Sequence, residues 1–197
     1  SAPLQAAGNA LNLNGYLQVN DAPELNLNNG FTIEAWIKPS DNNNNTIIDR
    51  GDYNYLLETH PNGQPGLGFY NPSIGWRYST SPLLVNEWSH VAATWDKSAG
   101  NLKFYKNGYL TDTFIGITEL AMDGGEVNIG RQSPATCLCN VFNGSLDEVR
   151  LFNVPRSQSE IFATMALSFP DVQLALTTSI PITFTDIFNT VKFNYWC

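Results

Sequence analysis

The sequence predicts an all-β fold, an antiparallel sandwich of two sheets, on three observations. Short segments with alternating apolar and polar residues recur along the chain, a pattern typical of strands that bury one face. Clusters of Asn, Gly, Pro and Asp separate them, as turns between antiparallel strands require. The chain has 197 residues, enough for one domain to bury a core. The segments read, in order, ALNLNG, GYLQVN, FTIEAWIK, TIIDRG, NYLLETH, GLGFYN, WRYSTS, WSHVAATW, NLKFYKNG, YLTDTF, EVNIGR and SLDEVRLFN.

Composition and charge limit the classes of function. Hydrophobic residues make up 43% of the chain and charged residues 14%, which favours a folded domain over a disordered one. With 18 acidic against 10 basic residues and no cluster of Lys or Arg, the chain repels phosphates and anionic lipid headgroups. No apolar run approaches the length of a bilayer-spanning helix. We therefore expect neither a nucleic-acid partner nor membrane insertion.

Residues 31–38 predict a strand with two unlike faces. The odd-numbered residues from Phe31 to Ile37 are apolar and share one face. The even-numbered residues, Glu34 among them, share the other. We expect the first face to be core and the second to be partly wet.

The stretch from Trp88 to Gly108 predicts two further strands and a hairpin turn. Asn107-Gly108 is the pair that tolerates the left-handed backbone of a tight turn. His90 lies in the first of these strands, and a lone histidine there is more often a framework residue than a catalyst. We interpret His90 as part of the frame.

One short helix is predicted near residues 157–166. Ser157 and Glu160 have the spacing of a capping box, in which each side chain satisfies the other residue's backbone N–H. We expect this helix to lie over one rim or face of the sandwich.

The composition changes after about residue 168. Residues 169–197 are apolar and rich in Thr, and alternation around 182–185 and 191–195 predicts two more strands. Left exposed, such strands would promote aggregation. The predicted organisation is therefore a domain over 1–168 and a C-terminal strand tail over 169–197, packed on the domain or on a neighbouring chain.

Cysteines and glycosylation sequons leave the compartment open. Cys137, Cys139 and Cys197 leave one thiol over whichever pair forms. A bond to Cys197 is possible in principle, whereas a bond between Cys137 and Cys139 would be strained. Asn44 and Asn143 begin N-x-S/T sequons, which matter only in a glycosylating secretory pathway.

The order and spacing of several motifs resemble a known family. The motifs are ALNLNGYLQV, FTIEAWIKP, NEWSHVAATWD followed by LKFYKNG, then VNIGR and FNGSLDEVRLFNVPRSQSEI. Over about residues 10–163 the chain is similar to the laminin-G-like, concanavalin-A-like jelly-roll domains of lectins, pentraxin-like proteins and extracellular adhesion proteins. The resemblance implies a jelly-roll sandwich that is secreted or displayed at the cell surface. The tail does not match the family.

The resemblance also implies calcium, which many members bind at a loop rim through carboxylates and backbone carbonyls. The matching donors are Asp147 and Asn14, with the carbonyls around Gly15. Family members often carry Asp in this first hairpin where the chain has Asn12 and Asn14, a difference that would weaken the site. The alternative is that Asp147 only caps a turn.

Catalytic constellations are absent from the sequence pattern. Relatives that hydrolyse glucans need two carboxylates about 5 Å apart on one strand. Glu34 is followed two residues later by Trp36, and the adjacent Asp147 and Glu148 point to opposite faces. No serine lies in a Gly-x-Ser-x-Gly elbow. We therefore expect no catalytic residue.

Aromatic residues supply a candidate sugar site. A pyranose offers apolar C–H faces and hydroxyl edges, which suit aromatic rings flanked by polar groups. Trp76 and Tyr78 share one strand face, which is a binding platform if exposed and core if not. The predicted ligand-binding residues are Tyr53, Tyr70, Trp76, Arg77 and Tyr78.

Three hypotheses of function follow. The first is a non-catalytic extracellular module that binds carbohydrate or another extracellular ligand, with calcium as a possible aid. The alternative is a structural subunit of a filament or sheath, assembled through residues 169–197. The third is a glycoside hydrolase of the same fold that uses Glu34 or Glu148. Arg50-Gly51-Asp52 spells the tripeptide that integrins recognise, but a three-residue match arises easily by chance.

Overall fold

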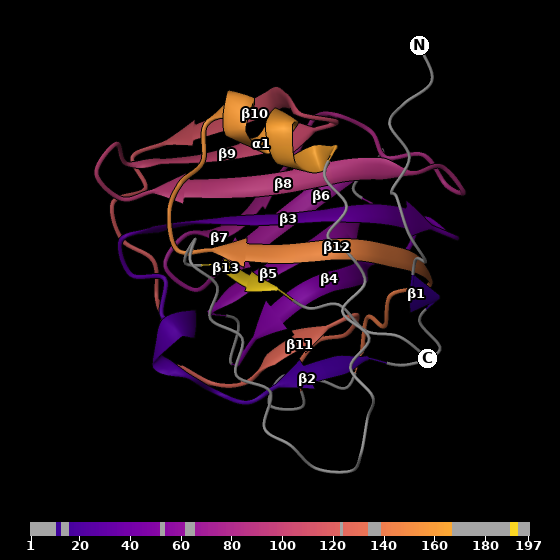
Figure 1. The fold of residues 1–197 in the computed structure, drawn as a ribbon, viewed down its shortest axis with the longest axis horizontal. Coiled ribbons are helices and arrows are strands. Elements are labelled where there is room, and N and C mark those ends of the chain that lie inside the picture. Colours follow the sequence, from indigo (N-terminus) through magenta and orange to yellow (C-terminus); the bar gives the residue numbers. More distant parts are fainter. Residues whose placement is uncertain are drawn as a thin grey trace.

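Two antiparallel sheets pack face to face in the computed structural model (Figure 1). The structure describes residues 11–12, 16–51, 54–61, 66–122, 124–133, 139–166 and 190–192. Within these residues, the 7-stranded sheet has the order β1 (Leu11–Asn12), β12 (Gly144–Phe152), β3 (Gly30–Pro39), β8 (Ser89–Asp96), β9 (Asn101–Lys106) and β10 (Tyr109–Ile115), and β13 (Thr190–Lys192) also pairs with β12. The 6-stranded sheet has the order β2 (Leu17–Val19), β11 (Val127–Ile129), β4 (Asn45–Arg50), β5 (Tyr55–His60), β6 (Gly66–Asn71) and β7 (Gly75–Tyr78).

Strands that are distant in sequence pair side by side, which identifies the topology. β12 lies beside β3, and β11 lies beside both β2 and β4. A 3-10 turn, η1 (Pro23–Leu25), and one α-helix, α1 (Gln158–Met165), complete the described elements. The predicted fold class, an antiparallel two-sheet jelly-roll sandwich with one short helix, is confirmed.

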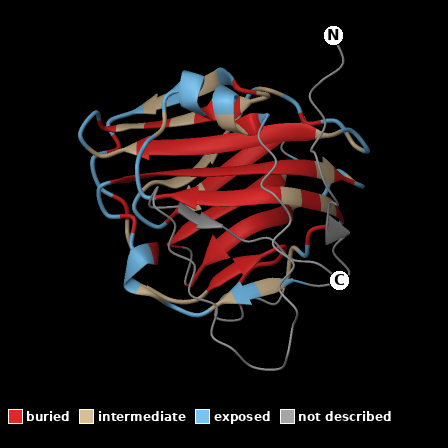
Figure 2. Ribbon diagram, in the orientation of Figure 1, coloured by how far each residue is buried: buried red, intermediate tan, exposed pale blue. Residues whose placement is uncertain are grey.

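The core lies between the two sheets, where Figure 2 shows the strands as buried. Aromatic rings meet across it, with the Phe31 centroid 5.6 Å from Phe69 of the facing sheet and 5.9 Å from Trp95. Alternate residues along each strand reach this layer because successive side chains point to opposite sides of a sheet. The alternation in the sequence therefore predicted the core face of β3 correctly.

The hairpin between β9 and β10 turns at Asn107-Gly108, as predicted. Asn107 has φ 51° and Gly108 has φ 77°, the left-handed conformation that such a turn requires. A Cβ on Gly108 would lie 2.7 Å from a ring carbon of Phe162, so only glycine lets this turn pack against α1.

Helix α1 covers the outer face of the 7-stranded sheet (Figure 1). Its N-cap is Ser157, which accepts a hydrogen bond from the Glu160 N–H, while the Glu160 carboxylate accepts one from the Ser157 N–H. The predicted capping box is confirmed. Ile161 packs on Ala92 and Tyr105 of the sheet, forming a second, small apolar cluster.

The second face of β3 is buried, which corrects the expectation of a partly wet face. Glu34 is fully buried, and Trp36 donates from its indole nitrogen to the Met165 carbonyl of α1 at 3.1 Å. Arg150 of β12 donates to Glu34 at 3.0 Å and to Glu148 at 2.7 Å. The face closes because a helix more than a hundred residues later in the chain lies on it.

His90 belongs to this covered face, in accord with its interpretation as a framework residue. Its ring stands edge-on to Trp36, with the centroids 5.5 Å apart. Burial lowers the pKa of His90 to about 3, and the positive charges of Arg150 and Arg156 act in the same direction. The imidazole is therefore neutral at ordinary pH.

Of the predicted tail, residues 169–197, the structure describes only residues 190–192. Residues 190–192 form β13, which pairs with Arg150–Phe152 of β12 in the same chain. The strand expected at 182–185 lies outside the described residues, and the division at residue 168 stays a prediction. Cys139 is disulfide-bonded, and the other two cysteines lie outside the described part.

Candidate functional site

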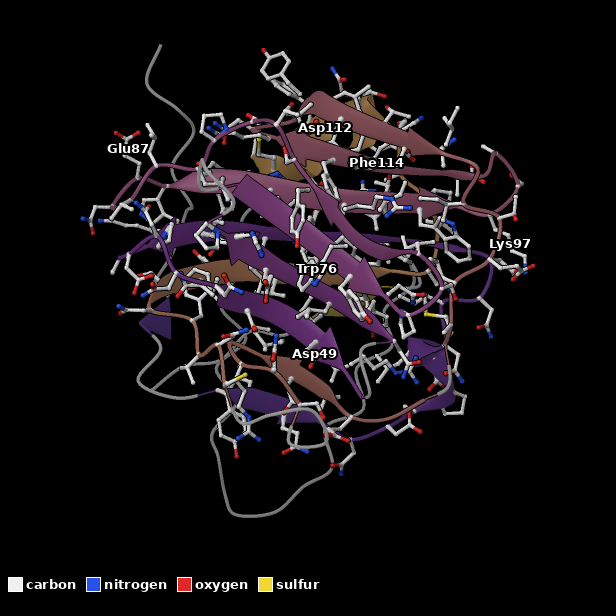
Figure 3. All side chains as sticks on the ribbon, turned by 180° about the vertical axis from the view of Figure 1, so that it is seen from behind. Asp49, Trp76, Glu87, Lys97, Asp112 and Phe114 are labelled. Atoms are coloured by element: carbon white, nitrogen blue, oxygen red, sulfur yellow. The ribbon has the colours of Figure 1, made fainter. Side chains whose placement is uncertain are left out.

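The outer face of the 6-stranded sheet carries the predicted aromatic residues. Leu67 and Phe69 of β6 belong to the core, so their neighbours Gly68 and Tyr70 point outward. Figure 3 views the molecule from this side and shows Trp76 above the middle strands and Asp49 further along the same face. α1, the one α-helix among the described residues, lies on the opposite side of the molecule and does not cover this face.

Four rings gather into what we call the aromatic platform, His60, Tyr70, Trp76 and Tyr78. Trp76 and Tyr78 are nearly parallel, with an interplanar angle of 11° and a centroid separation of 5.5 Å. His60 lies 4.3 Å from Tyr78, and Tyr70 lies 5.2 Å from Trp76. All four side chains are half-buried, so each keeps part of its ring accessible.

Gly68 makes room for the platform. It stands opposite Tyr78 in the register of β6 and β7. A Cβ added there would lie 3.3 Å from ring carbons of both Trp76 and Tyr78. The two rings therefore lean over β6 toward His60 on β5, in the space that a side chain at position 68 would take.

β7, which carries Trp76 and Tyr78, is an edge strand of the 6-stranded sheet, and the residues that follow it are hydrogen-bonded to the other sheet. Beyond the end of β7, Ser79 donates from its hydroxyl to Asp112 of β10 at 2.6 Å, and the Thr80 N–H donates to the same carboxylate at 3.1 Å. The Ser79 N–H also donates to the Leu67 carbonyl at 2.8 Å. These bonds fix the strand that carries Trp76.

Glu58 lies beside the platform, and the sequence pattern did not single it out as a candidate. It stands opposite Gly68 on one side and opposite Thr46 on the other. The carboxylate is buried and accepts a hydrogen bond from Gln132 Nε2 at 3.4 Å. Burial raises the pKa of Glu58 to about 7, and the negative charge of Asp49 adds to the increase.

A segment after β11 crosses this end of the face. The Ser133 N–H donates to Oδ2 of Asp49 at 2.7 Å, next to the contact between Gln132 and Glu58. Arg131 of the same segment lies over the Tyr16 ring, 3.1 Å from its centroid. Asp49 and Glu58, which we call the carboxylate pair, are thus enclosed between the sheet and this segment.

The five predicted ligand-binding residues are only partly brought together. Tyr70, Trp76 and Tyr78 lie in the platform. Arg77 does not, because it pairs with the core residue Phe69 and faces the other way, donating to the carbonyls of Ile74 and Trp76 at 2.7 and 2.8 Å. Tyr53 lies outside the described residues. A ligand-binding role for these residues stays a prediction.

The predicted metal ligands are not gathered in the described structure. Asp147 lies in β12 at an irregularity of the strand, where its Oδ1 accepts from the Glu148 N–H at 2.8 Å. Asn14 and Gly15 lie outside the described residues. Among the residues described, three or more His, Cys, Asp or Glu never cluster in a way that would hold a metal ion. Calcium stays a prediction.

The glutamates of the hydrolase hypothesis belong to an ion-paired group under α1. Glu34 and Glu148 flank Arg150, and both are buried. A shallow recess of about 380 Å³ opens nearby, beside the start of α1. It is lined by Thr94, Asp96, Asn101, Lys103, Tyr105, Leu110, Pro155, Arg156, Ser157 and Gln158, and neither Glu34 nor Glu148 is among these residues.

The integrin-like tripeptide is anchored by its arginine. Arg50 is buried, and its Nη2 donates to Asp21 and to Asn26 at 2.8 Å each. The guanidinium therefore holds the loops at this end of the sandwich together and is not displayed to a receptor. No described helix is long and apolar enough to cross a membrane.

Comparisons with known proteins agree with the observed fold. The family described as the Concanavalin A-like lectin/glucanases superfamily matches residues 11–162. No curated protein sequence matches the chain. Among solved structures, a heptameric SAP-like pentraxin from Limulus polyphemus superposes with a TM-score of 0.65 at 18% identity, covering 77% of this chain and 75% of that one.

Two further similar structures concern carbohydrate. A candidate carbohydrate-binding protein from Bacteroides ovatus has 25% identity and a TM-score of 0.61, covering 78% of this chain and 45% of that chain. Domain 4 of an extracellular arabinanase from Geobacillus stearothermophilus, solved with arabinotriose, has 20% identity and a TM-score of 0.63, covering 81% and 78%. The chain therefore spans less than half of the Bacteroides protein.

Proposed function

We propose, since the chain belongs to the concanavalin A-like lectin/glucanases superfamily, that it is a non-catalytic carbohydrate-binding module. The observation that carries the proposal is the aromatic platform, in which the half-buried Trp76 and Tyr78 rings stack in parallel on a sheet face that no described helix covers. Rings that served only to stabilise the fold would be expected between the two sheets, in the core. Parallel rings at a surface offer a sugar two adjacent stacking positions.

The chemistry of a pyranose or furanose suits this surface. Its C–H faces pack on aromatic rings, while its hydroxyls need polar partners at the edge of the stack. His60 and the phenol of Tyr78 supply such partners at the rim of the platform. The arabinanase domain solved with arabinotriose shares the fold and supports the choice of ligand class.

An extracellular location fits the same proposal. Cys139 is disulfide-bonded, and disulfides persist in oxidising compartments. The low content of basic residues is suited to a module that meets neutral polysaccharide and not nucleic acid. We therefore propose that the protein is secreted or displayed at the cell surface and meets glycan or an extracellular protein there.

Calcium assistance is a separate part of the proposal. Asp147 with Asn14 and the carbonyls around Gly15 would supply oxygen ligands, the type that calcium prefers. A melting temperature that rises with calcium and falls with a chelator is the expected result. An unchanged melting temperature would remove calcium from the proposal and leave the platform untouched.

Assembly through residues 169–197 is the second candidate. The described part of the tail, β13, pairs with β12 of its own chain, which favours packing on the domain. Light scattering on the full chain and on a chain that ends at residue 168 separates the two arrangements. A full chain that assembles beside a monomeric truncation would make the protein a structural subunit.

Calorimetric titration with neutral oligosaccharides tests the main proposal. Replacing Trp76 with Ala removes half of the stacked pair. We expect affinity to fall about tenfold, because an aromatic contact and the apolar area that it buries together contribute a binding free energy of about that size. Trp88→Ala is the matched control, because Trp88 is also half-buried but lies outside the platform. Equal losses in both variants, or no ligand in a broad glycan array, would refute the proposal.

A further inference from the structure

Glu58 places a buried carboxylate beside the platform, and within the described residues its contacts include a neutral amide and a second carboxylate but no cation. We infer that the outer face of the 6-stranded sheet selects uncharged sugars over sugars that carry a carboxylate, and that Glu58 sets this preference. The inference rests on the proposed function and names the ligand class of the same site. Glu58 acts through its field, because the carboxylate is enclosed and does not itself touch the surface.

The register brings this charge close to the stacking surface. Glu58, Gly68 and Tyr78 occupy one row across β5, β6 and β7. Gly68 has no side chain, so nothing in that row separates the carboxylate from the Tyr78 ring. Burial raises the pKa of Tyr78, and the negative charge of Glu58 adds to the increase.

Among the described residues, the arginines nearest to the platform make contacts elsewhere. Arg77, next to the platform in sequence, faces away and donates to two main-chain carbonyls. Arg131 lies over Tyr16 at the β2 edge of the sheet. Gln132, the hydrogen-bond donor to Glu58, is a neutral amide. A ligand carboxylate on the platform would therefore meet a negative charge and gain no salt bridge from the described strands of this face.

The protonation of Glu58 makes the preference adjustable. With its pKa near 7, the side chain is mostly ionised at about pH 8 and mostly neutral at about pH 5. The titratable groups that face it are Asp49 from β4, His60 from its own strand and Tyr78 from β7. Desolvation lowers the pKa of His60.

Distance sets the size of the expected effect. Two strand spacings separate Glu58 from β7, roughly 10 Å. At that separation, and with the effective dielectric constant typical of protein sites, repulsion between two like charges weakens the binding of a charged ligand about tenfold or somewhat more. An effect of this size is large enough to measure and small enough to leave the fold intact.

Matched oligosaccharide pairs provide the experiment. The probes are 1,4-linked trimers of galactose, glucose and mannose, each beside the uronate trimer in which only the C6 group is oxidised. Affinities are measured by titration calorimetry at about pH 8 and about pH 5. For the pair that binds, we expect the neutral trimer to bind about tenfold tighter at the higher pH, and the ratio to shrink at the lower pH.

Variants assign the effect to its source. Glu58→Gln keeps the shape and removes the charge, so we expect the preference and its pH dependence to be lost together. Glu24→Gln removes the same charge from an exposed position on η1 and should behave as the native protein. Survival of the pH dependence in Glu58→Gln would implicate His60 and overturn the assignment.

The outcomes separate this inference from the proposed function. Equal affinity of the native protein for both members of a pair at the higher pH overturns charge selection and leaves carbohydrate binding in place. Absence of binding to every trimer and to a broad glycan array overturns both. Tighter binding of the uronate would also contradict the inference, because it would require a cation at the platform.

Discussion

The outer faces of the two sheets bury charged residues in opposite ways. Under α1, Glu34 and Glu148 share Arg150 between them, so positive and negative groups alternate. On the 6-stranded sheet, Glu58 lies near Asp49 and its hydrogen-bond donor is the neutral Gln132. One face is covered by a helix, and the other presents half-buried aromatic rings.

The difference suggests two kinds of buried charge, one that stabilises the fold through ion pairs and one that is expected at a binding site. A buried carboxylate is tolerated when a cation and hydrogen bonds replace the lost water, as for Glu34. A carboxylate that is buried beside a second one and lacks such a cation lowers stability, and that arrangement is found disproportionately at functional sites. The contrast therefore favours the face without the helix as the place of the proposed sugar site.

Removal of Arg150 should have the largest effect on stability. It would disrupt the face under α1, which we call the balanced face because Arg150 pairs there with two glutamates. Arg150→Ala takes away the cation that the two buried glutamates share and leaves Glu34 only the longer contact with Arg156 at 3.8 Å, so we expect the free energy of unfolding to fall by about 3 to 5 kcal/mol. Urea denaturation followed by tryptophan fluorescence measures the change. Lys97→Ala, which breaks an exposed pair with Glu119, should cost less than about 1 kcal/mol. Similar losses in both variants would contradict the comparison.

The pH dependence of stability tests the outer face of the 6-stranded sheet, where Glu58 is buried near Asp49. The pKa of Glu58 rises from 4.5 to about 7 on folding, so the native state holds this proton more tightly than the unfolded chain does. Its contribution is therefore complete below about pH 4.5 and is lost as the pH rises through 7, a change on the order of 3 kcal/mol.

The Glu58→Gln variant isolates that contribution from other carboxylates. Groups such as Asp21 and Asp112 have lowered pKa values, and their contributions are lost at acid pH instead. The difference between the two unfolding curves should be close to zero below pH 4.5 and should favour the variant at higher pH, by up to about 3 kcal/mol. A flat difference would show that Glu58 has an ordinary pKa.

Local signals in the sequence predicted the frame well. The apolar alternation of 31–37, the Asn107-Gly108 turn and the Ser157–Glu160 capping box each depend on residues within a few positions of one another. All three are found in the structure. The same alternation already placed Arg77 opposite Trp76, so the exclusion of Arg77 from the platform could have been predicted.

The environment of Glu58 could not be predicted in this way. It depends on the register of three strands and on Gln132, which lies 74 positions later in the chain. The closed second face of β3 similarly depends on Met165, 129 positions from Trp36. Burial by distant segments decides which polar residues are paired, and no local pattern records it.

Removal of the N-cap of α1 should have the smallest effect on stability, and it tests whether the two outer faces are independent. Ser157→Ala removes the hydroxyl that accepts from the Glu160 N–H, and the loss of such a cap costs about 1 kcal/mol. Because α1 covers only the balanced face, we expect lower stability with unchanged sugar affinity. Ser159→Ala, an exposed serine whose hydroxyl contacts that of Ser157 at 3.0 Å but does not cap the helix, should lower stability less and leave sugar affinity unchanged. Weaker sugar binding in Ser157→Ala would mean that the two faces are coupled through the core, so that the helix supports the platform as well as the sheet beneath it.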